Sequence, residues 1–274
     1  MILQQPWLPP VRPVTPVAPY IGGKRRLAGR VIERLAAMPA HTTYAEAFIG
    51  MGGVFLRRPF KAHAEVINDI NADVAGLFRV LQRHFQYFMD MMRFQLTTRV
   101  EFERLVATDP ATLTDLERAA RFIYLQRTAF GGKVVGQNFG VSPATPARFD
   151  VNRLGVILEA VHERLSSVVI ERLAWLAFIR RYDRAETLFY LDPPYYGNED
   201  DYGEGVFSVE DFTAMADLLR GMKGRFLLSL NDRPEVRRIF TGVAMEGVSV
   251  DYSVSGGSRI KAREVLISNW SPGG

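Results

Sequence analysis

The sequence of 274 residues contains no cysteine. Without thiols the chain cannot form disulfide bonds, thiolate metal sites or a cysteine nucleophile, which excludes several classes of enzyme chemistry. Only four histidines are present, at positions 41, 63, 84 and 162, and they are too scattered to predict a metal cluster. We therefore expect a function that needs neither a metal ion nor a thiol.

Long apolar runs are also absent. No segment approaches the roughly 20 apolar residues that a membrane helix needs. Residues 1–20 lack the basic start and apolar core of a signal peptide. The sequence thus predicts a cytoplasmic protein without a membrane partner, and its 47% of hydrophobic residues suffices for one catalytic domain with a modest insertion.

The net charge is only +4, although the calculated pI is about 9.4. Residues 79–181 carry 15 Lys and Arg against 10 Asp and Glu, whereas residues 182–274 carry 10 against 15. A basic middle segment is typical of a protein that meets nucleic-acid phosphates, and a solvated helical surface gives the same count. The charge pattern alone leaves both interpretations open.

Six prolines fall between residues 6 and 19. Because proline has no backbone N–H, this segment cannot donate a regular ladder of hydrogen bonds. We expect residues 1–18 to form an extended arm that runs over the surface as a tail.

Behind the arm, apolar periodicity predicts alternating strands and helices. The predicted strands are apolar runs at 43–48, 66–69, 167–170, 187–192, 225–232, 246–252 and 263–269. The last two are expected to pair as an antiparallel hairpin. Residues 85–165 show helical periodicity without strands and are predicted to be an insertion, so that 19–84 and 166–274 form the catalytic domain. A short helix is expected directly after residue 53.

A glycine-rich turn, Phe48 to Gly53, separates the first strand from this short helix. Gly50 and Gly52 would let the backbone approach a ligand closely, although a tight turn alone explains them equally well. Asp69 ends the next strand, near the spacing at which an acidic residue binds ribose hydroxyls in α/β folds. The alternative is that Asp69 caps the helix that begins near Asn71.

The strongest signal is Asp192-Pro193-Pro194-Tyr195, directly after an apolar strand. Open sheets place their active sites at this end of a strand. A carboxylate and the Pro193 carbonyl can accept hydrogen bonds from the two protons of an arylamine, and a tyrosine face can stack on a flipped base. The alternative is a loop whose prolines only prevent helix formation and whose tyrosine belongs to the core, and the position directly after a strand disfavours it.

Five segments resemble, in order, the motifs of the DNA adenine methylase family. They are PYIGGK (19–24), YAEAFIGMGGVFL (44–56), VINDIN (66–71), RAARFIYLQRTAFGG (118–132) and LFYLDPPYYG (188–197). The resemblance covers residues 19–270. It implies an α/β, Rossmann-like S-adenosylmethionine-dependent methyltransferase core with a mostly helical target-recognition insertion at 85–165.

The resemblance also implies the reaction, which is methyl transfer to the 6-amino group of adenine in double-stranded DNA with a flipped target base, leaving S-adenosylhomocysteine. The residues it implies for catalysis are Asp192, Pro193, Pro194 and Tyr195. Those it implies for cofactor binding are Tyr20, Lys24, Phe48, Gly50, Gly52, Asp69 and Asp192. Lys24 is either solvated or reaches acidic side chains of the pocket, and the resemblance favours the latter. Many members of the family carry an acidic residue directly before the aromatic residue that corresponds to Trp175, whereas this chain has Ala174 there. The resemblance therefore assigns no cofactor-adenine contact to this segment.

Candidate DNA contacts lie in the insertion. Three arginines at helical spacing and three polar residues of the following loop are of the types that read base edges: Arg118, Arg121, Arg127, Lys133, Gln137 and Asn138. A solvated helix face is the alternative for the arginines.

Other functions are less compatible with the sequence. Methylation at carbon 5 of cytosine needs a cysteine nucleophile, which is absent. Cytosine amino-methyltransferases usually have serine where this chain has Asp192, so adenine is favoured as the substrate. The predicted insertion resembles that of DNA methyltransferases rather than RNA methyltransferases. A nucleic-acid-binding module without catalytic activity would not need an intact Asp192–Tyr195 tetrapeptide. We expect a monomer associated with the nucleoid through DNA. Roles in restriction-modification, gene regulation or protection of a phage or mobile element stay open.

Overall fold

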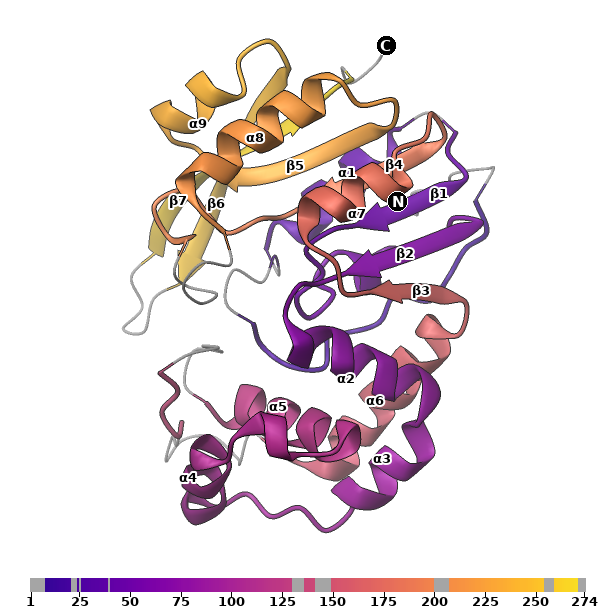
Figure 1. Ribbon diagram of the computed structural model, residues 1–274, viewed down its shortest axis with the longest axis vertical. Helices are drawn as coiled ribbons and strands as arrows, with labels where there is room; N and C mark the ends of the chain where they lie inside the picture. The colour runs from indigo at the N-terminus through magenta and orange to yellow at the C-terminus, as the bar shows by residue number, and fades with distance from the viewer. Residues whose placement is uncertain are drawn as a thin grey trace.

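The computed structural model in Figure 1 describes residues 8–20, 24, 26–38, 40–129, 136–140, 149–199, 207–253 and 259–270. Its centre is a sheet with the strand order β3-β2-β1-β4-β5-β7-β6. The strands are β1 (Thr43–Glu46), β2 (Ala64–Asn68), β3 (Val168–Glu171), β4 (Thr187–Leu191), β5 (Arg225–Asn231), β6 (Ala244–Ser253) and β7 (Arg259–Ser268). Each lies where the sequence predicts a strand, within a few residues at its ends.

Strands β1 to β5 run parallel, and β6 and β7 form the predicted antiparallel hairpin beside β5. The chain moves outward from β1 to β2 and β3, then returns to β4 on the other side of β1. Such a reversal of strand order opens a crevice at the carboxyl ends of the two central strands. Glu46 of β1 pairs in register with Tyr190 of β4, so both lie at this crevice.

Helices cover both faces of the sheet, which explains why all five residues of β4 are buried. Leu188 and Tyr190 point to the face covered by α1 and α2, whereas Phe189 and Leu191 point to the face covered by α7, α8 and α9. The helices of the core are α1 (Ala28–Ala36), α2 (Ala72–Arg83), α7 (Trp175–Tyr182), α8 (Val209–Arg220) and α9 (Pro234–Ile239). The α/β, Rossmann-like core expected from the sequence is confirmed.

The predicted insertion is helical in its described part. Its helices are α3 (Phe85–Met92), α4 (Arg99–Ala107), α5 (Asp115–Thr128) and α6 (Val151–Leu165), with a 3-10 turn at Pro110–Thr112. Figure 1 shows them gathered beyond the β3 edge of the sheet, where α2 packs against α5 and α6. Helix α5 begins with a reciprocal capping box between Thr114 and Glu117.

The expectation that residues 1–18 form a surface tail is wrong for part of residues 8–18, the segment of the arm that the structure describes. Val14, Val17 and Ala18 are buried and belong to the hydrophobic core. The backbone N–H of Val14 donates to the Leu56 carbonyl over 2.7 Å. Proline spacing does not reveal which side chains of the arm become buried.

The short helix expected after the glycine-rich turn is present as a 3-10 helix. It is a single 3-10 turn, Phe55–Arg57, because Arg58 leaves the helical conformation with φ −62° and ψ 129°.

In the described ranges, no helix combines the length and the apolar character that a bilayer-spanning segment requires.

Candidate functional site

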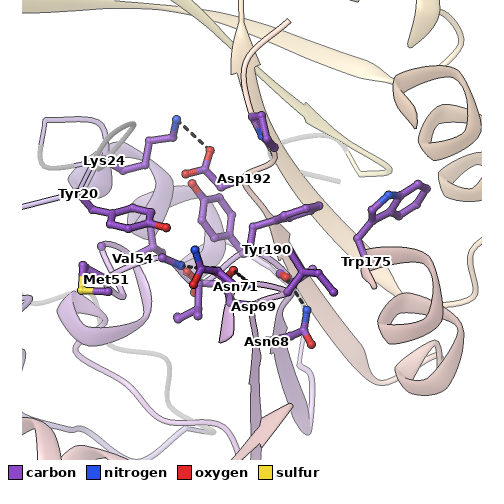
Figure 2. A pocket seen from close by; sticks show the side chains of 18 of the residues that line it. Tyr20, Lys24, Met51, Val54, Asn68, Asp69, Asn71, Trp175, Tyr190 and Asp192 are labelled. Carbon is purple, nitrogen blue, oxygen red and sulfur yellow. Dashed lines mark hydrogen bonds and ion pairs between the residues drawn. The ribbon is translucent and has the colours of Figure 1, made fainter. Parts of the chain in front are cut away.

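A cavity of about 460 Å³ opens at the carboxyl ends of β1, β2 and β4. This volume lies in the range of small-molecule sites in proteins. Figure 2 shows Tyr20, Lys24 and Asp192 on one side of the cavity and Trp175, from α7, on the other. The cavity therefore occupies the crevice that the strand order creates.

The glycine-rich turn forms one wall. Gly50 and Gly52 have φ values of +48° and +72°, a region that side-chain-bearing residues rarely adopt. A Cβ at Gly50 would lie 3.0 Å from the Tyr20 ring, so glycine lets this ring lie on the turn. A Cβ at Gly52 would instead meet Leu56 of the core at 2.8 Å. Gly52 is absent from the cavity wall, and Gly53 lines it in its place.

Asp69 ties this turn to the next one. Its Oδ2 accepts from the Gly50 N–H over 3.0 Å, and its Oδ1 accepts from the Asn71 N–H over 2.9 Å. Burial raises the pKa of Asp69 to about 6, although both hydrogen bonds oppose this shift. Asn71, not Asp69, caps α2 by accepting from Asp73 and Val74. Asp69 is thus an ionisable acceptor on the cavity wall.

Asp192 begins the loop after β4 and lines the cavity. Its Oδ1 lies 2.9 Å from Lys24 Nζ and accepts from Ser229 Oγ over 2.8 Å. In the described part of the chain, Oδ2 has no comparable partner. Burial raises the pKa of Asp192, while Lys24 and Ser229 lower it. The carboxylate is therefore fixed through one oxygen, and the second is available to a ligand.

Lys24 joins several acidic and aromatic groups, as predicted for a lysine that reaches the pocket. It is buried, pairs with Asp192, lies 3.6 Å from Glu264 Oε2 and donates to the Tyr195 hydroxyl. Its Nζ also lies 4.1 Å from the centroid of the Tyr195 ring. Tyr195 is half-buried and, unlike Pro194, does not line the cavity itself.

The catalytic loop is clamped from β5. The N–H of Tyr196 donates to Asn231 Oδ1 over 3.0 Å, and Asn231 Nδ2 donates back to the Tyr196 carbonyl over 2.9 Å. Pro193 and Pro194 are buried between this clamp and β4. The tetrapeptide is therefore held at both ends, by Lys24 and Ser229 at Asp192 and by Asn231 beyond Tyr195.

The sequence interpretation missed two buried carboxylates beside the cavity. Glu46, only 2% exposed, accepts from the Tyr44 hydroxyl over 2.6 Å, and burial raises the pKa of Glu46 to about 8. Glu264, 1% exposed, lies on β7 beside Lys24. Glu46 interrupts an apolar run, which is a signal that could have identified it, whereas Glu264 follows Lys261 and Arg263 on β7 and has no such signal.

Aromatic residues form the opposite wall. Phe48 and Phe207 meet edge to face with ring centroids 6.0 Å apart, and the ring centroids of Trp175 and Phe207 are 6.2 Å apart. Trp175 Nε1 donates to Asp211 Oδ1 over 3.2 Å, which fixes the indole at the cavity. Trp175 therefore contributes to the wall despite the departure at Ala174, and Phe207 and Asp211 are further lining residues that the sequence interpretation missed.

The three arginines singled out as DNA contacts make contacts within the protein. Arg118 donates to Asp73 of α2, Arg121 Nε donates to the Leu105 carbonyl at the end of α4 over 2.7 Å, and Arg127 donates to Val17 over 2.7 Å. Burial lowers the pKa of Arg121 and Arg127. The three side chains are half-buried and contact other parts of the protein, so they do not form a fully solvated helix face.

The loop behind α5 is described only in part. Gln137 Nε2 donates to Gln126 Oε1 over 2.9 Å, and Gln126 donates to the Pro19 carbonyl over 3.4 Å. Asn138 is exposed. Lys133 lies outside the described residues.

Comparison with known proteins gives a consistent set of similarities. The family model of the D12 class N6 adenine-specific DNA methyltransferases matches residues 20–252. The type II methyltransferase M.CviBI of Paramecium bursaria Chlorella virus NC1A is 21% identical over 229 residues, 83% of this chain and 86% of the viral protein. The type II methyltransferase M1.LlaDCHI of Lactococcus lactis subsp. cremoris is 24% identical over 280 residues, 93% of this chain and 95% of the other. The DNA N-6-adenine-methyltransferase of Escherichia phage P1 is 27% identical over 276 aligned positions, and the alignment covers 90% of this chain and 34% of the phage protein.

Proposed function

The chain belongs to the D12 class of N6 adenine-specific DNA methyltransferases, so its reaction is methyl transfer to adenine in DNA, and we propose that the cavity described above binds the methyl donor, with the target base held beside it by the loop from Asp192 to Tyr195. The observation that carries this proposal is the state of Asp192, which is fixed through Oδ1 by Lys24 and Ser229. Oδ2 is left beside the cavity, where an amino group can reach it.

The cavity has the groups that S-adenosylmethionine needs. Asp69 can accept from ribose hydroxyls, and the wall of Phe48, Trp175 and Phe207 suits a purine ring. The Gly50 turn, with Tyr20 lying on it, gives a narrow backbone-lined end for the amino-acid part. S-adenosylmethionine, when bound, supplies a methyl group activated by a sulfonium, and S-adenosylhomocysteine remains after transfer.

Asp192 and the Pro193 carbonyl accept hydrogen bonds from the two protons of the adenine amino group in this proposal. These bonds localise the nitrogen lone pair as the nitrogen becomes tetrahedral. With S-adenosylmethionine bound, the nitrogen would take the methyl group from the sulfonium, and the Asp192 carboxylate would accept one of the two amino protons. Tyr195, held by Lys24, stacks on the flipped base.

The helical segment 85–165 is proposed as the target-recognition insertion. The excess of basic residues in 79–181 supports contact with double-stranded DNA. Gln137, the exposed Asn138 and Lys133 of the same loop are the proposed DNA contacts, whereas the interior contacts of the three arginines favour a role in holding α5 in place.

Cofactor binding tests the assignment of the cavity. In calorimetry, Asp69→Ala should weaken S-adenosylmethionine binding by about 5- to 150-fold, the equivalent of roughly 1–3 kcal/mol for unpaired ribose hydroxyls. Asp217→Ala, at an exposed position of α8, is the matched control and should bind normally. Because the pKa of Asp69 is about 6, wild-type affinity should fall as the pH drops through this value, and Asp69→Asn should lack that step. Equal affinity of Asp69→Ala and wild type contradicts the assignment.

A further inference from the structure

A buried chain of hydroxyl groups lies behind Asp192. Ser229 of β5 donates from Oγ to Asp192 Oδ1 over 2.8 Å, and the Tyr190 hydroxyl of β4 lies 2.9 Å from the same Oγ. Ser229 is 0% exposed and Tyr190 is 1% exposed. Water therefore does not compete for these two hydrogen bonds.

The direction of both bonds follows from the number of protons. A serine hydroxyl has one proton, and Ser229 gives it to Asp192. The proton between Tyr190 and Ser229 must therefore come from the tyrosine. Burial raises the pKa of Tyr190 well above its ordinary value, so its hydroxyl keeps that proton at any working pH. The chain runs one way, from Tyr190 through Ser229 to Asp192.

Asp192 faces charged groups from several other elements. Lys24, just ahead of α1, lowers its pKa, whereas Glu264 of β7 raises it. Glu46 of β1 also interacts unfavourably with the Asp192 charge. Lys24 is shared with Glu264 and Tyr195. Ser229 thus gives its single proton to Asp192 and supports its ionisation beside Lys24, whereas burial and Glu264 oppose that ionisation.

We propose that Ser229 is a positioning residue for methyl transfer, and that Tyr190 acts through it, together holding Asp192 as an ionised acceptor with Oδ2 directed to the substrate amino group. This inference rests on the proposed role of Asp192. An ionised carboxylate only accepts hydrogen bonds, whereas a protonated one also donates and would oppose an amino proton. Losing the Ser229 hydroxyl therefore makes Asp192 easier to protonate and frees it to rotate.

The test is the pH dependence of the single-turnover rate of methyl transfer to a DNA duplex, measured with melting temperatures. Ser229→Ala should move the acid limb of the pH–rate profile to higher pH by about half a pH unit or more. The reason is that the lost hydrogen bond stabilises the ionised form of Asp192, and one pKa unit corresponds to 1.36 kcal/mol. Tyr190→Phe should move it in the same direction by less. The double variant should match Ser229→Ala, because Tyr190 acts through Ser229. Ser229→Thr, which keeps the hydroxyl, should restore the wild-type profile.

Tyr182→Phe is the matched control, because it removes a tyrosine hydroxyl bonded to Glu171 outside the cavity. It should leave the acid limb unchanged. Lower melting temperatures with an unmoved limb in both Ser229→Ala and Tyr190→Phe would overturn the inference, as would additive shifts in the double variant. Asp192→Ala separates the two levels: if it keeps activity, the proposed function fails, and if it is inactive while Ser229→Ala has a wild-type profile, only the present inference fails.

Discussion

Single residues of this enzyme depend on burial for their chemistry. Glu46 has an ordinary pKa of 4.5, and in the folded chain burial raises its pKa to about 8. Its neighbour Tyr44 donates to it, which opposes this rise only in part. Glu46 is therefore protonated in the folded protein under conditions in which the unfolded chain has lost that proton.

This difference predicts a pH dependence of stability. Between pH 4.5 and about 8 the folded state binds one more proton at Glu46 than the unfolded state, so the free energy of unfolding should fall as pH rises. Glu46→Gln removes this contribution. Its melting temperature relative to wild type should rise by several degrees from about pH 5 to pH 8.5. The exposed Glu103→Gln should show a flat difference, and a flat difference for Glu46→Gln would refute the shift.

Tyr195 allows a second prediction for one residue. Tyr195→Phe keeps the ring but loses the bond from Lys24, so turnover should fall by no more than about tenfold. Tyr195→Ala should lose about 1–3 kcal/mol of base stacking, or 5- to 150-fold in single-turnover rate, and an unpaired target adenine should partly rescue it. A large drop in melting temperature with normal turnover per folded molecule would place the ring in the core instead.

Among the elements, the arm differs most from its sequence-based expectation. Val17 is 0% exposed, and its carbonyl accepts from Arg127 of α5. Val17→Ala should create a cavity and cost about 1–2 kcal/mol, which lowers the melting temperature by a few degrees. Thr15→Ala, at an exposed position of the same arm, should have no such effect. Equal melting temperatures for both variants would mean that the arm does not contribute to the core.

Elements defined by local pattern could be predicted from the sequence. The apolar run before Asp192 involves neighbouring residues only, and the structure confirms it as β4. Contacts between distant segments could not. Ser229 and Glu264 reach Asp192 and Lys24 only because the strand order places β5 beside β4 and β7 beside β5. No local periodicity reports that order.

The arginines of α5 show the same limit. Their helical spacing is visible in the sequence, and a basic helix in a DNA-binding enzyme suggests an exposed face. Their partners, however, lie on α2, on α4 and in the arm. Residue type predicted a cation, whereas packing determined what that cation contacts.

Across the whole molecule, the insertion and the cavity are directly connected. Gln126 and Arg127 of α5 donate to the Pro19 and Val17 carbonyls, and the arm then leads to Tyr20 at the cavity wall. The proposed DNA contact Gln137 bonds to Gln126. The segment that would meet DNA and the site that would transfer the methyl group are therefore parts of one hydrogen-bonded unit.

The most direct test of the account is the identity of the methylated base. Wild type and Asp192→Ala would each be incubated with unmethylated duplex DNA and S-adenosylmethionine, and the digested nucleosides measured by mass spectrometry. The account predicts N6-methyladenine with wild type and a loss of roughly 100-fold or more with Asp192→Ala at an unchanged melting temperature. Methylated cytosine with the wild-type enzyme, or Asp192→Ala activity within about tenfold of wild type, would contradict it.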